Sequence, residues 1–205
     1  MTYDLYIFGS AVRGEVSSSS DIDVLAIPLA SDQRDYPNNW SVYSPETIES
    51  YFRAGRLFAW HLHLEAKCIF SAAPIPYLSS LGAPAPYSSA REDIDDLAEM
   101  LWQSLLEIRS ETNNLIYELG LAYTAIRDIA MSASWSLMDG PCFSRNAPYI
   151  IPIPCPISVE AYQGAMLARH CSTRGSEHGI DAERVARELL AAPLHSWVRD
   201  IRSTT

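Results

Sequence analysis

Two aspartates near the start of the chain, Asp21 and Asp23, are separated by one residue in an otherwise apolar run that predicts a β-strand over residues 21–27. Alternate residues of a strand point to the same face, so the two carboxylates would lie side by side. Such carboxylates bind Mg²⁺ or Mn²⁺ together with substrate phosphates. Because aspartate is disfavoured in strands, the pair predicts a metal site for phosphoryl or nucleotidyl transfer, in which metals neutralise charge and align the attacking oxygen with the leaving group.

A Gly-Ser pair lies where a turn must follow an earlier strand. Residues 3–8 are rich in aromatic and branched side chains and predict a buried strand that stops at Gly9. Glycine lets the backbone turn sharply and come close to a ligand, and Ser10 offers a hydroxyl and an N–H group. Residues 10–14 are expected to begin a short helix, whose exposed N–H groups favour phosphate oxygens.

The spacing of these two features resembles a known signature. Gly-Ser at 9–10, ten further residues and Asp-Ile-Asp at 21–23 resemble the polymerase-beta-like nucleotidyltransferase superfamily, whose signature is a hydrophobic residue, Gly-Ser, about ten residues and Asp-x-Asp on a strand. The Arg-Gly pair at 13–14 and the serine at 20 also resemble the minimal members of that superfamily.

The resemblance implies a role for each matching residue. The expected nucleotide contacts are Gly9, Ser10, Arg13 and Ser20, and the expected catalytic metal ligands are Asp21 and Asp23. Arg13 would touch phosphate or, alternatively, cap the loop. The resemblance further implies a nucleoside triphosphate substrate, ATP in the first place, and transfer of its monophosphate to a hydroxyl group with release of pyrophosphate.

The superfamily normally adds a third carboxylate from a later strand, and the corresponding strand here, residues 40–44, contains no acid. Glu65 is the expected catalytic substitute, at the end of a helix predicted over residues 45–65, with solvation of the helix end as the alternative. Relatives that modify antibiotics take the base from their helical half, which makes Glu111 or Glu118 the other candidates.

Two histidines, His61 and His63, precede Glu65. On a strand they would share one face and be able to bind a metal together. On the predicted helix they point about 200° apart, so packing or surface roles are expected instead.

The composition of the chain changes near its middle. Residues 71–90 contain four prolines and almost no charge, which is typical of a linker. Helices are predicted beyond it over residues 91–108, 115–138, 158–172 and 180–191, and residues 141–157 are expected to be irregular. We therefore predict an α/β (α+β) nucleotidyltransferase domain with a small mixed sheet, residues 1–75, a Pro-rich linker, residues 76–87, and an all-α helical domain, residues 88–205.

Composition argues against several classes of protein. The chain has 205 residues and a net charge of −10, and 14 of its 15 basic residues are scattered arginines. This disfavours a broad nucleic-acid-binding surface, although an RNA end remains a candidate acceptor. No apolar run approaches the roughly 20 residues that span a bilayer, and no signal peptide is evident, so a cytoplasmic location without membrane contact is expected. The four cysteines form no CxxC pair, which argues against zinc and disulfides.

The first functional hypothesis is a metal-dependent nucleotidyltransferase that acts on a protein, an RNA or a small molecule, by analogy in a toxin–antitoxin or phage-defence setting. A catalytically silent nucleotide-binding regulator or partner-binding protein is the first alternative, favoured by the acid-free strand at 40–44. An aminoglycoside-type drug nucleotidyltransferase is the second, favoured by the two-part layout. A protein partner or a homodimer is compatible with each of them. Within the predicted helical domain, residues 88–205, the Arg, four to six residues, His motif of helical nuclease-like toxins is absent, so no RNase site is expected there.

Overall fold

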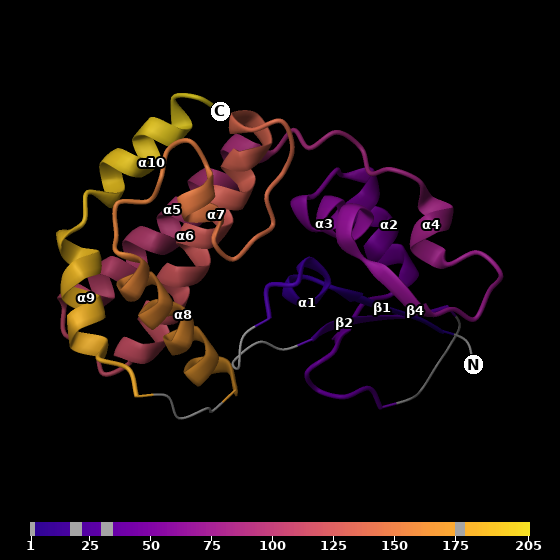
Figure 1. Ribbon diagram of the computed structural model, residues 1–205, viewed down its shortest axis with the longest axis horizontal. Helices are drawn as coiled ribbons and strands as arrows, with labels where there is room; N and C mark the ends of the chain where they lie inside the picture. The colour runs from indigo at the N-terminus through magenta and orange to yellow at the C-terminus, as the bar shows by residue number, and fades with distance from the viewer. Residues whose placement is uncertain (1–2, 17–21, 30–34, 175–178) are drawn as a thin grey trace. The chain divides into compact units, whose positions relative to one another are not determined.

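The computed structural model describes residues 3–16, 22–29, 35–174 and 179–205. The chain divides into two compact units, Met1–Ser89 and Ala90–Thr205 (Figure 1). The first unit combines a small mixed sheet with helices, and the described part of the second contains helices and no strand. The predicted fold class is therefore confirmed.

The first unit is built on a four-stranded sheet in the order β3-β2-β1-β4. Its strands are β1 (Tyr3–Phe8), β2 (Asp23–Pro28), β3 (Ser41–Val42) and β4 (Lys67–Phe70). The central strand β1 pairs antiparallel with β2 and with β4, whereas β2 and β3 run parallel. The strand that we predicted over residues 21–27 is thus described from Asp23 to Pro28.

One face of this sheet forms a core with three helices. They are α2 (Pro45–Arg53), α3 (Leu57–Glu65) and α4 (Tyr77–Leu81), and Figure 1 shows them on the same side of the sheet. Side chains alternate along β1, so that Tyr6 and Phe8 are buried on this face while Leu5 and Ile7 are only half-buried. The core is therefore one-sided, with the helices packed on the face that carries Tyr6 and Phe8.

The single helix that we predicted over residues 45–65 is wrong, because the chain forms two helices, α2 and α3. The predicted start is confirmed, since the Ser44 hydroxyl accepts a hydrogen bond from the Thr47 N–H at 3.3 Å and caps α2. The break falls at Gly55, which has a φ of 61°. A Cβ atom at Gly55 would lie 2.5 Å from the Ala85 carbonyl oxygen, so a segment 30 residues later fixes the bend.

The Pro-rich segment that we predicted as a linker, residues 76–87, is packed into the first unit. It contains α4, and the Ala85 N–H donates to the Phe52 carbonyl at 2.8 Å. The Ala85 carbonyl in turn accepts a hydrogen bond from the indole N–H of Trp60 at 2.9 Å. The first unit is consequently longer than we expected and ends at Ser89.

A fully buried aspartate, Asp4, ties this segment to the start of β1. Its carboxylate accepts hydrogen bonds from the Tyr6 hydroxyl at 3.0 Å and the Ser71 hydroxyl at 2.9 Å. It also accepts the backbone N–H groups of Ala72 at 3.0 Å and Tyr77 at 2.6 Å. A buried carboxylate needs such donors to offset its lost hydration, and here they fix the path of the chain after β4.

The second unit is organised around its longest helix, α6 (Leu115–Leu137). It packs against α5 (Ala90–Arg109) on one side and α8 (Val159–Arg174) on another. A Cβ atom at Gly120 would lie 2.9 Å from the Arg169 Cα atom, so α6 and α8 approach closely there. The remaining helices are α7 (Ala147–Ile150), α9 (Ala182–Ala191) and α10 (Leu194–Arg202).

The four helices predicted for this unit are present with small shifts at their ends. Two helices were missed. The short helix α7 lies in the segment expected to be irregular, and α10 follows the last predicted helix. α10 buries four side chains at helical spacing, Leu194, Trp197, Val198 and Ile201.

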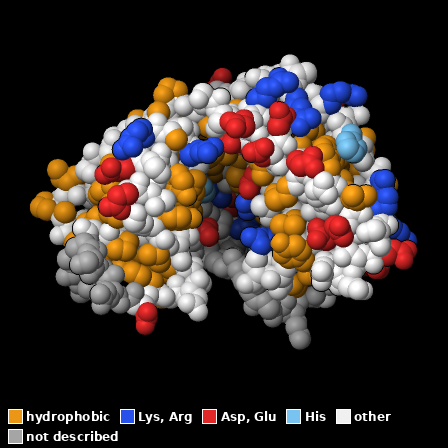
Figure 2. Space-filling view, turned by 180° about the vertical axis from the view of Figure 1, so that it is seen from behind, with side chains coloured by type: hydrophobic (Ala, Val, Ile, Leu, Met, Phe, Trp, Pro, Cys, Tyr) orange, Lys and Arg blue, Asp and Glu red, His pale blue; other side chains and the backbone are white. Residues whose placement is uncertain are grey.

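Acidic and basic side chains are interspersed on the face of the helical unit seen at the right of Figure 2. This face therefore presents no continuous basic stripe of the kind that grips a nucleic-acid backbone. Within the described ranges, no helix is both long enough and apolar enough to cross a membrane.

Candidate functional site

The turn after β1 brings Gly9 against Asp23. Asp23 is the first described residue of β2 and pairs with Phe8, the last residue of β1. Gly9 has φ 71° and ψ −149°, a conformation that is essentially restricted to glycine. A Cβ atom at Gly9 would collide with the Asp23 carboxylate and lie 3.3 Å from its Cγ atom. The buried backbone of Gly9 and the carboxylate of the exposed Asp23 therefore meet at one corner at the end of the sheet.

The predicted short helix after Gly9 is present as α1 (Ser10–Arg13). The N–H groups of Val12 and Arg13 donate to the Gly9 carbonyl at 3.1 and 3.3 Å, and Gly14 closes the helix in the left-handed conformation with φ 74°. Ser10 is half-buried at the start of this turn. Because α1 is a single turn, phosphate would be bound by the local N–H and hydroxyl groups of the turn and not by a helix dipole. This phosphate binding stays a prediction.

Glu65 lies in a cluster of charged side chains at the same end of the sheet. Its Oε2 atom accepts a hydrogen bond from Arg13 Nη1 at 2.5 Å and lies 3.0 Å from His61 Nε2. Glu65 ends α3, and β4 begins two residues later with Lys67, which pairs with Ile7 near the end of β1. The side chains of Arg13, His61 and Glu65 are 19%, 17% and 16% exposed, so the cluster is largely removed from water.

The charges in this cluster determine the protonation of Glu65. Burial alone would raise the pKa of its carboxyl group, but the hydrogen bond from His61 and the positive charges of His61 and Arg13 outweigh it and hold the pKa below its usual value. Glu65 is therefore ionised at neutral pH. An ionised carboxylate beside a turn that approaches Asp23 is chemically suited to accept a proton from a hydroxyl group.

Two further contacts fix the cluster. Arg13 Nε binds Glu15 Oε2 at 3.1 Å, so this arginine bridges two carboxylates. The His61 ring packs edge-to-face against Phe8, with 5.5 Å between ring centroids. The last residue of β1 thus orients the histidine that contacts Glu65.

The histidine pair expected only on a strand is not formed, because His61 and His63 lie on α3. His61 faces Arg13 and Glu65, whereas His63 is exposed and contacts the Trp60 ring at 5.8 Å. Joint metal binding by the two histidines is therefore excluded by the helical geometry, as the helix prediction implied.

The remaining predicted site residues divide into three groups. Asp21 and Ser20 lie outside the described residues. β3, next to β2, supplies no acid, as its sequence implied. Glu111 and Glu118 belong to the second unit, where Glu111 is exposed and Glu118 is buried near the start of α6.

The metal prediction rests on an incomplete set of ligands. Asp23 is an exposed residue whose carboxylate lies against the Gly9 turn, and carboxylate oxygens are ligands that Mg²⁺ prefers. Within the described ranges, however, no three His, Cys, Asp or Glu side chains gather closely enough to hold an ion. The carboxylate of Asp23 is one suitable ligand for a divalent cation. Its expected partner Asp21 lies outside those ranges, so the two-aspartate site stays a prediction.

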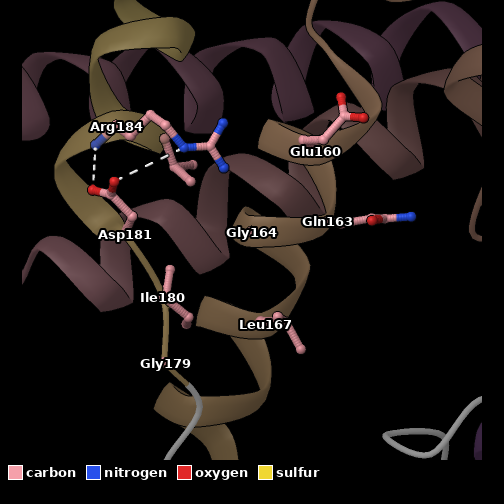
Figure 3. A pocket seen from close by; sticks show the side chains of 9 residues that line it. Glu160, Gln163, Gly164, Leu167, Gly179, Ile180, Asp181 and Arg184 are labelled. Atoms are coloured by element: carbon pink, nitrogen blue, oxygen red, sulfur yellow. Dashed lines mark hydrogen bonds and ion pairs between the residues drawn. The ribbon is translucent and has the colours of Figure 1, made fainter.

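A pocket of about 260 Å³ lies in the second unit between α8 and α9 (Figure 3). Asp181 on its rim accepts the Arg184 N–H at 3.0 Å and caps α9, and its second oxygen lies 3.9 Å from Arg184 Nε. The opposite wall carries Gln163 and Glu160 of α8. The charged pair on this rim is thus accounted for by helix capping.

Two contacts of the Glu65 cluster and the role of Asp4 in β1 were not predicted from the sequence. His61 and Glu65 are four residues apart, a spacing that places side chains together on any helix, so the sequence contained this signal. The contact between Arg13 and Glu65 joins residues 52 apart and had no local signal. The role of Asp4 was also missed, although an aspartate inside an apolar strand was a cue for a special environment.

No protein-family description matches the chain, and no curated protein matches it. Among solved structures, the chain is similar to spectinomycin adenyltransferase AAD(9) from Enterococcus faecialis, crystallised with ATP and spectinomycin. The sequence identity is 13% and the TM-score 0.48, and the alignment covers 98% of this chain and 91% of that one. A TM-score this low decides neither fold nor function.

Proposed function

We propose that the first unit transfers a nucleoside monophosphate, in the first place AMP from ATP, to a hydroxyl acceptor with release of pyrophosphate. The observation that carries this proposal is the side-chain-free corner at Gly9, where the backbone lies directly against the Asp23 carboxylate. A triphosphate can approach a glycine backbone closely, and an adjacent carboxylate suits the cation that accompanies it.

Each residue of the corner has a distinct part in this proposal. Asp21 and Asp23 would hold Mg²⁺ or Mn²⁺, which would neutralise the charge of the phosphates. The Ser10 hydroxyl and the Arg13 guanidinium would donate hydrogen bonds to phosphate oxygens, and Ser20 would add a further contact. The fold supports this arrangement by placing Gly9, Arg13 and Asp23 at one end of the sheet.

Glu65 would act as the general base. Its ionised carboxylate would take the proton of the acceptor hydroxyl while the acceptor oxygen forms a bond to the α-phosphorus. The bond from that phosphorus to the bridging oxygen would break, and pyrophosphate would leave with the electron pair. The lowered pKa of Glu65 supports a base that is unprotonated at neutral pH, although it also makes that base weaker.

The test is incubation of the purified protein with Mg²⁺ and α-³²P-labelled ATP, GTP, CTP or UTP in lysate of its host. The proposal predicts label on a protein, RNA or small molecule that disappears with Asp23→Asn and with the double variant Asp21→Asn/Asp23→Asn. Asp35→Asn, an exposed acid of the same unit, is the matched control. Label that survives loss of both aspartates would overturn the proposal.

A catalytically silent regulator is the second candidate, because β3 carries no acid and Glu65 is already engaged by Arg13 and His61. It predicts Mg²⁺-dependent nucleotide binding without transfer. Calorimetric titration with ATP in parallel with the labelling assay separates the two candidates.

The acceptor and the cellular setting follow from where the label appears. Label on a partner protein or an RNA end would support a toxin–antitoxin or phage-defence role in the cytoplasm, and label on an added aminoglycoside would support drug modification. A homodimer remains part of the proposal, and sedimentation of the labelled protein would test it.

A further inference from the structure

We propose that His61 is a positioning residue, which holds the Glu65 carboxylate in place independently of Arg13 when Arg13 turns to a nucleotide phosphate. The inference rests on the proposed function, since it concerns the base and the phosphate contact of that same corner. It concerns a residue to which the nucleotidyltransferase resemblance gives no role.

Both partners of Glu65 converge on one oxygen. Arg13 Nη1 and His61 Nε2 lie 2.5 and 3.0 Å from Glu65 Oε2. Among the contacts of the described residues, every hydrogen bond to this carboxylate falls on Oε2. Oε1 is therefore left to accept a proton from a hydroxyl group while Oε2 is held.

The two partners differ in where they are attached. His61 lies one turn before Glu65 on α3 and moves with it as part of the same helix. Arg13 comes from α1, three residues after Ser10, and reaches Glu65 from across the corner. Motion of the turn would therefore displace Arg13 and leave the pair on α3 intact.

Hydrogen-bond chemistry assigns the direction of the His61 contact. An ionised carboxylate only accepts and a guanidinium only donates, so His61 Nε2 must carry a hydrogen to bind Glu65. The contact of 3.5 Å between Arg13 Nη1 and His61 Nε2 then joins two donors and adds little. The edge-to-face packing on Phe8 holds the ring in the orientation that this donation requires.

Arg13 is the partner that a phosphate can take over. Its guanidinium is shared between Glu15 Oε2 at 3.1 Å and Glu65 Oε2 at 2.5 Å, and guanidinium groups bind phosphate oxygens by the same paired geometry. Once Arg13 binds phosphate, the negative charge of the nucleotide would repel Glu65. His61 is then the donor that keeps the carboxylate at the corner.

Variants of His61 separate its hydrogen bond from its packing. His61→Phe keeps a ring beside Phe8 but removes the Nε2–H donor, and His61→Gln restores an N–H donor without the ring. His63→Phe, on the exposed side of the same helix, is the matched control. Circular dichroism and thermal unfolding would establish that each variant is folded.

The direct readout is the pH titration of the Glu65 carboxyl carbon by ¹³C NMR in the Arg13→Gln background, which imitates the departure of Arg13 without any nucleotide. The groups that surround this carboxyl are Arg13 and Glu15 from the α1 segment and His61 from α3. We expect the pKa of Glu65 to rise further when His61→Phe is added, to be partly restored by His61→Gln and to be unchanged by His63→Phe. An unchanged pKa of Glu65 when His61→Phe is added to Arg13→Gln would overturn the proposal.

Activity gives an independent readout. In the labelling assay, His61→Phe should lower the rate of transfer by about 10²-fold, the cost of a misplaced catalytic group, while the affinity for Mg²⁺ and a non-transferable ATP analogue changes less than about twofold. Loss of affinity with an unchanged rate would contradict a positioning role. Failure of the wild-type chain to bind the analogue would remove the proposed function, whereas the nucleotide-free titration would still decide the role of His61.

Discussion

The two ends of β1 each stand beside a carboxylate that is shielded from water, but the partners of the two groups differ in kind. Asp4, at the start of the strand, accepts hydroxyl groups of Tyr6 and Ser71 and two backbone N–H groups. Glu65, beyond the other end, is held by the side chains of Arg13 and His61. One carboxylate is bound by neutral donors fixed in the chain, and the other by a charged side chain that other anions also attract.

Under the proposed function, this difference would separate a structural acid, Asp4, from a reactive one, Glu65. The donors of Asp4 include backbone groups of the segment after β4, so the carboxylate cannot leave without unfolding that segment. The contact of Arg13 with Glu65 joins two side chains, so the proposed exchange of Glu65 for a phosphate would break no backbone hydrogen bond between them. Asp4 is fully buried and Glu65 is largely so, and the chemical identity of their donors distinguishes the two sites more clearly than this difference in burial.

The largest expected effect is on the reactive side. Glu65→Gln should reduce nucleotide transfer by about 10²- to 10⁴-fold, because a general base is lost. The affinity for Mg²⁺-ATP should stay equal or increase, because Arg13 loses a competing carboxylate and the phosphates lose a repelling charge. Transfer rates and calorimetric affinities measured side by side would check this, and a parallel fall in both would make Glu65 a binding residue instead.

Replacement of the structural acid should act on folding. Asp4→Asn should lower the free energy of unfolding by about 2–4 kcal/mol, since an amide cannot accept all the hydrogen bonds of the carboxylate and leaves donors unsatisfied. Urea unfolding of Asp4→Asn and Glu65→Gln would measure the contrast. A Glu65 variant that lost as much stability as the Asp4 variant would break the distinction between the two ends.

Two glycines offer a smaller and sharper test of the corner beyond β1. Gly9 and Gly82 have nearly the same backbone conformation, with φ 71° at both and ψ −149° and −154°. A Cβ atom at Gly82 meets no atom within 4 Å, whereas one at Gly9 collides with Asp23. Both alanine variants should lose about 1–3 kcal/mol through backbone strain.

Only Gly9→Ala should also abolish Mg²⁺-dependent nucleotide binding, because it displaces the Asp23 carboxylate. Thermal unfolding measures the shared loss, and calorimetric titration with ATP measures the difference. Equal nucleotide affinity in the two variants would show that the Gly9 corner is not where the nucleotide binds.

The smallest effect concerns pH. The pKa of Glu65 is lowered in the folded protein, so its ionised form contributes stability that is fully present above the unfolded value of about 4.3 and is lost as pH falls through the folded pKa. The difference in Tm between the wild-type chain and Glu65→Gln should therefore become smaller as the pH falls below about 4.3. A difference that stays unchanged through this acidic range would mean that Glu65 is not held as described.

Local sequence patterns were enough to predict some of the elements. The aromatic and branched residues of β1, the turn at Gly9 and the Ser44 cap before Pro45 each act within a few residues. Features set by distant contacts were not predictable in this way. The bend at Gly55 depends on Ala85, and the packing of the Pro-rich segment depends on Asp4.

The candidate site shows the same division between features set by local spacing and features set by distant contacts. Gly9 and Asp23 were predicted from their spacing, and their contact agrees with it. Glu65 was predicted because the strand at 40–44 lacks an acid. Its contact with Arg13 could not be predicted, because no local pattern links residues that are 52 positions apart. The helix α10 is a different case, since its buried residues follow a helical spacing that the sequence contained.

The most direct test of the central claim compares ATP labelled at the α- and the γ-phosphorus in parallel reactions with Mg²⁺ and host lysate. Nucleotidyl transfer predicts that the α-label moves to the acceptor, that the γ-label is recovered in pyrophosphate, and that Asp23→Asn abolishes both. Transfer of the γ-label to the acceptor, or α-labelling that persists in Asp23→Asn, would contradict the account.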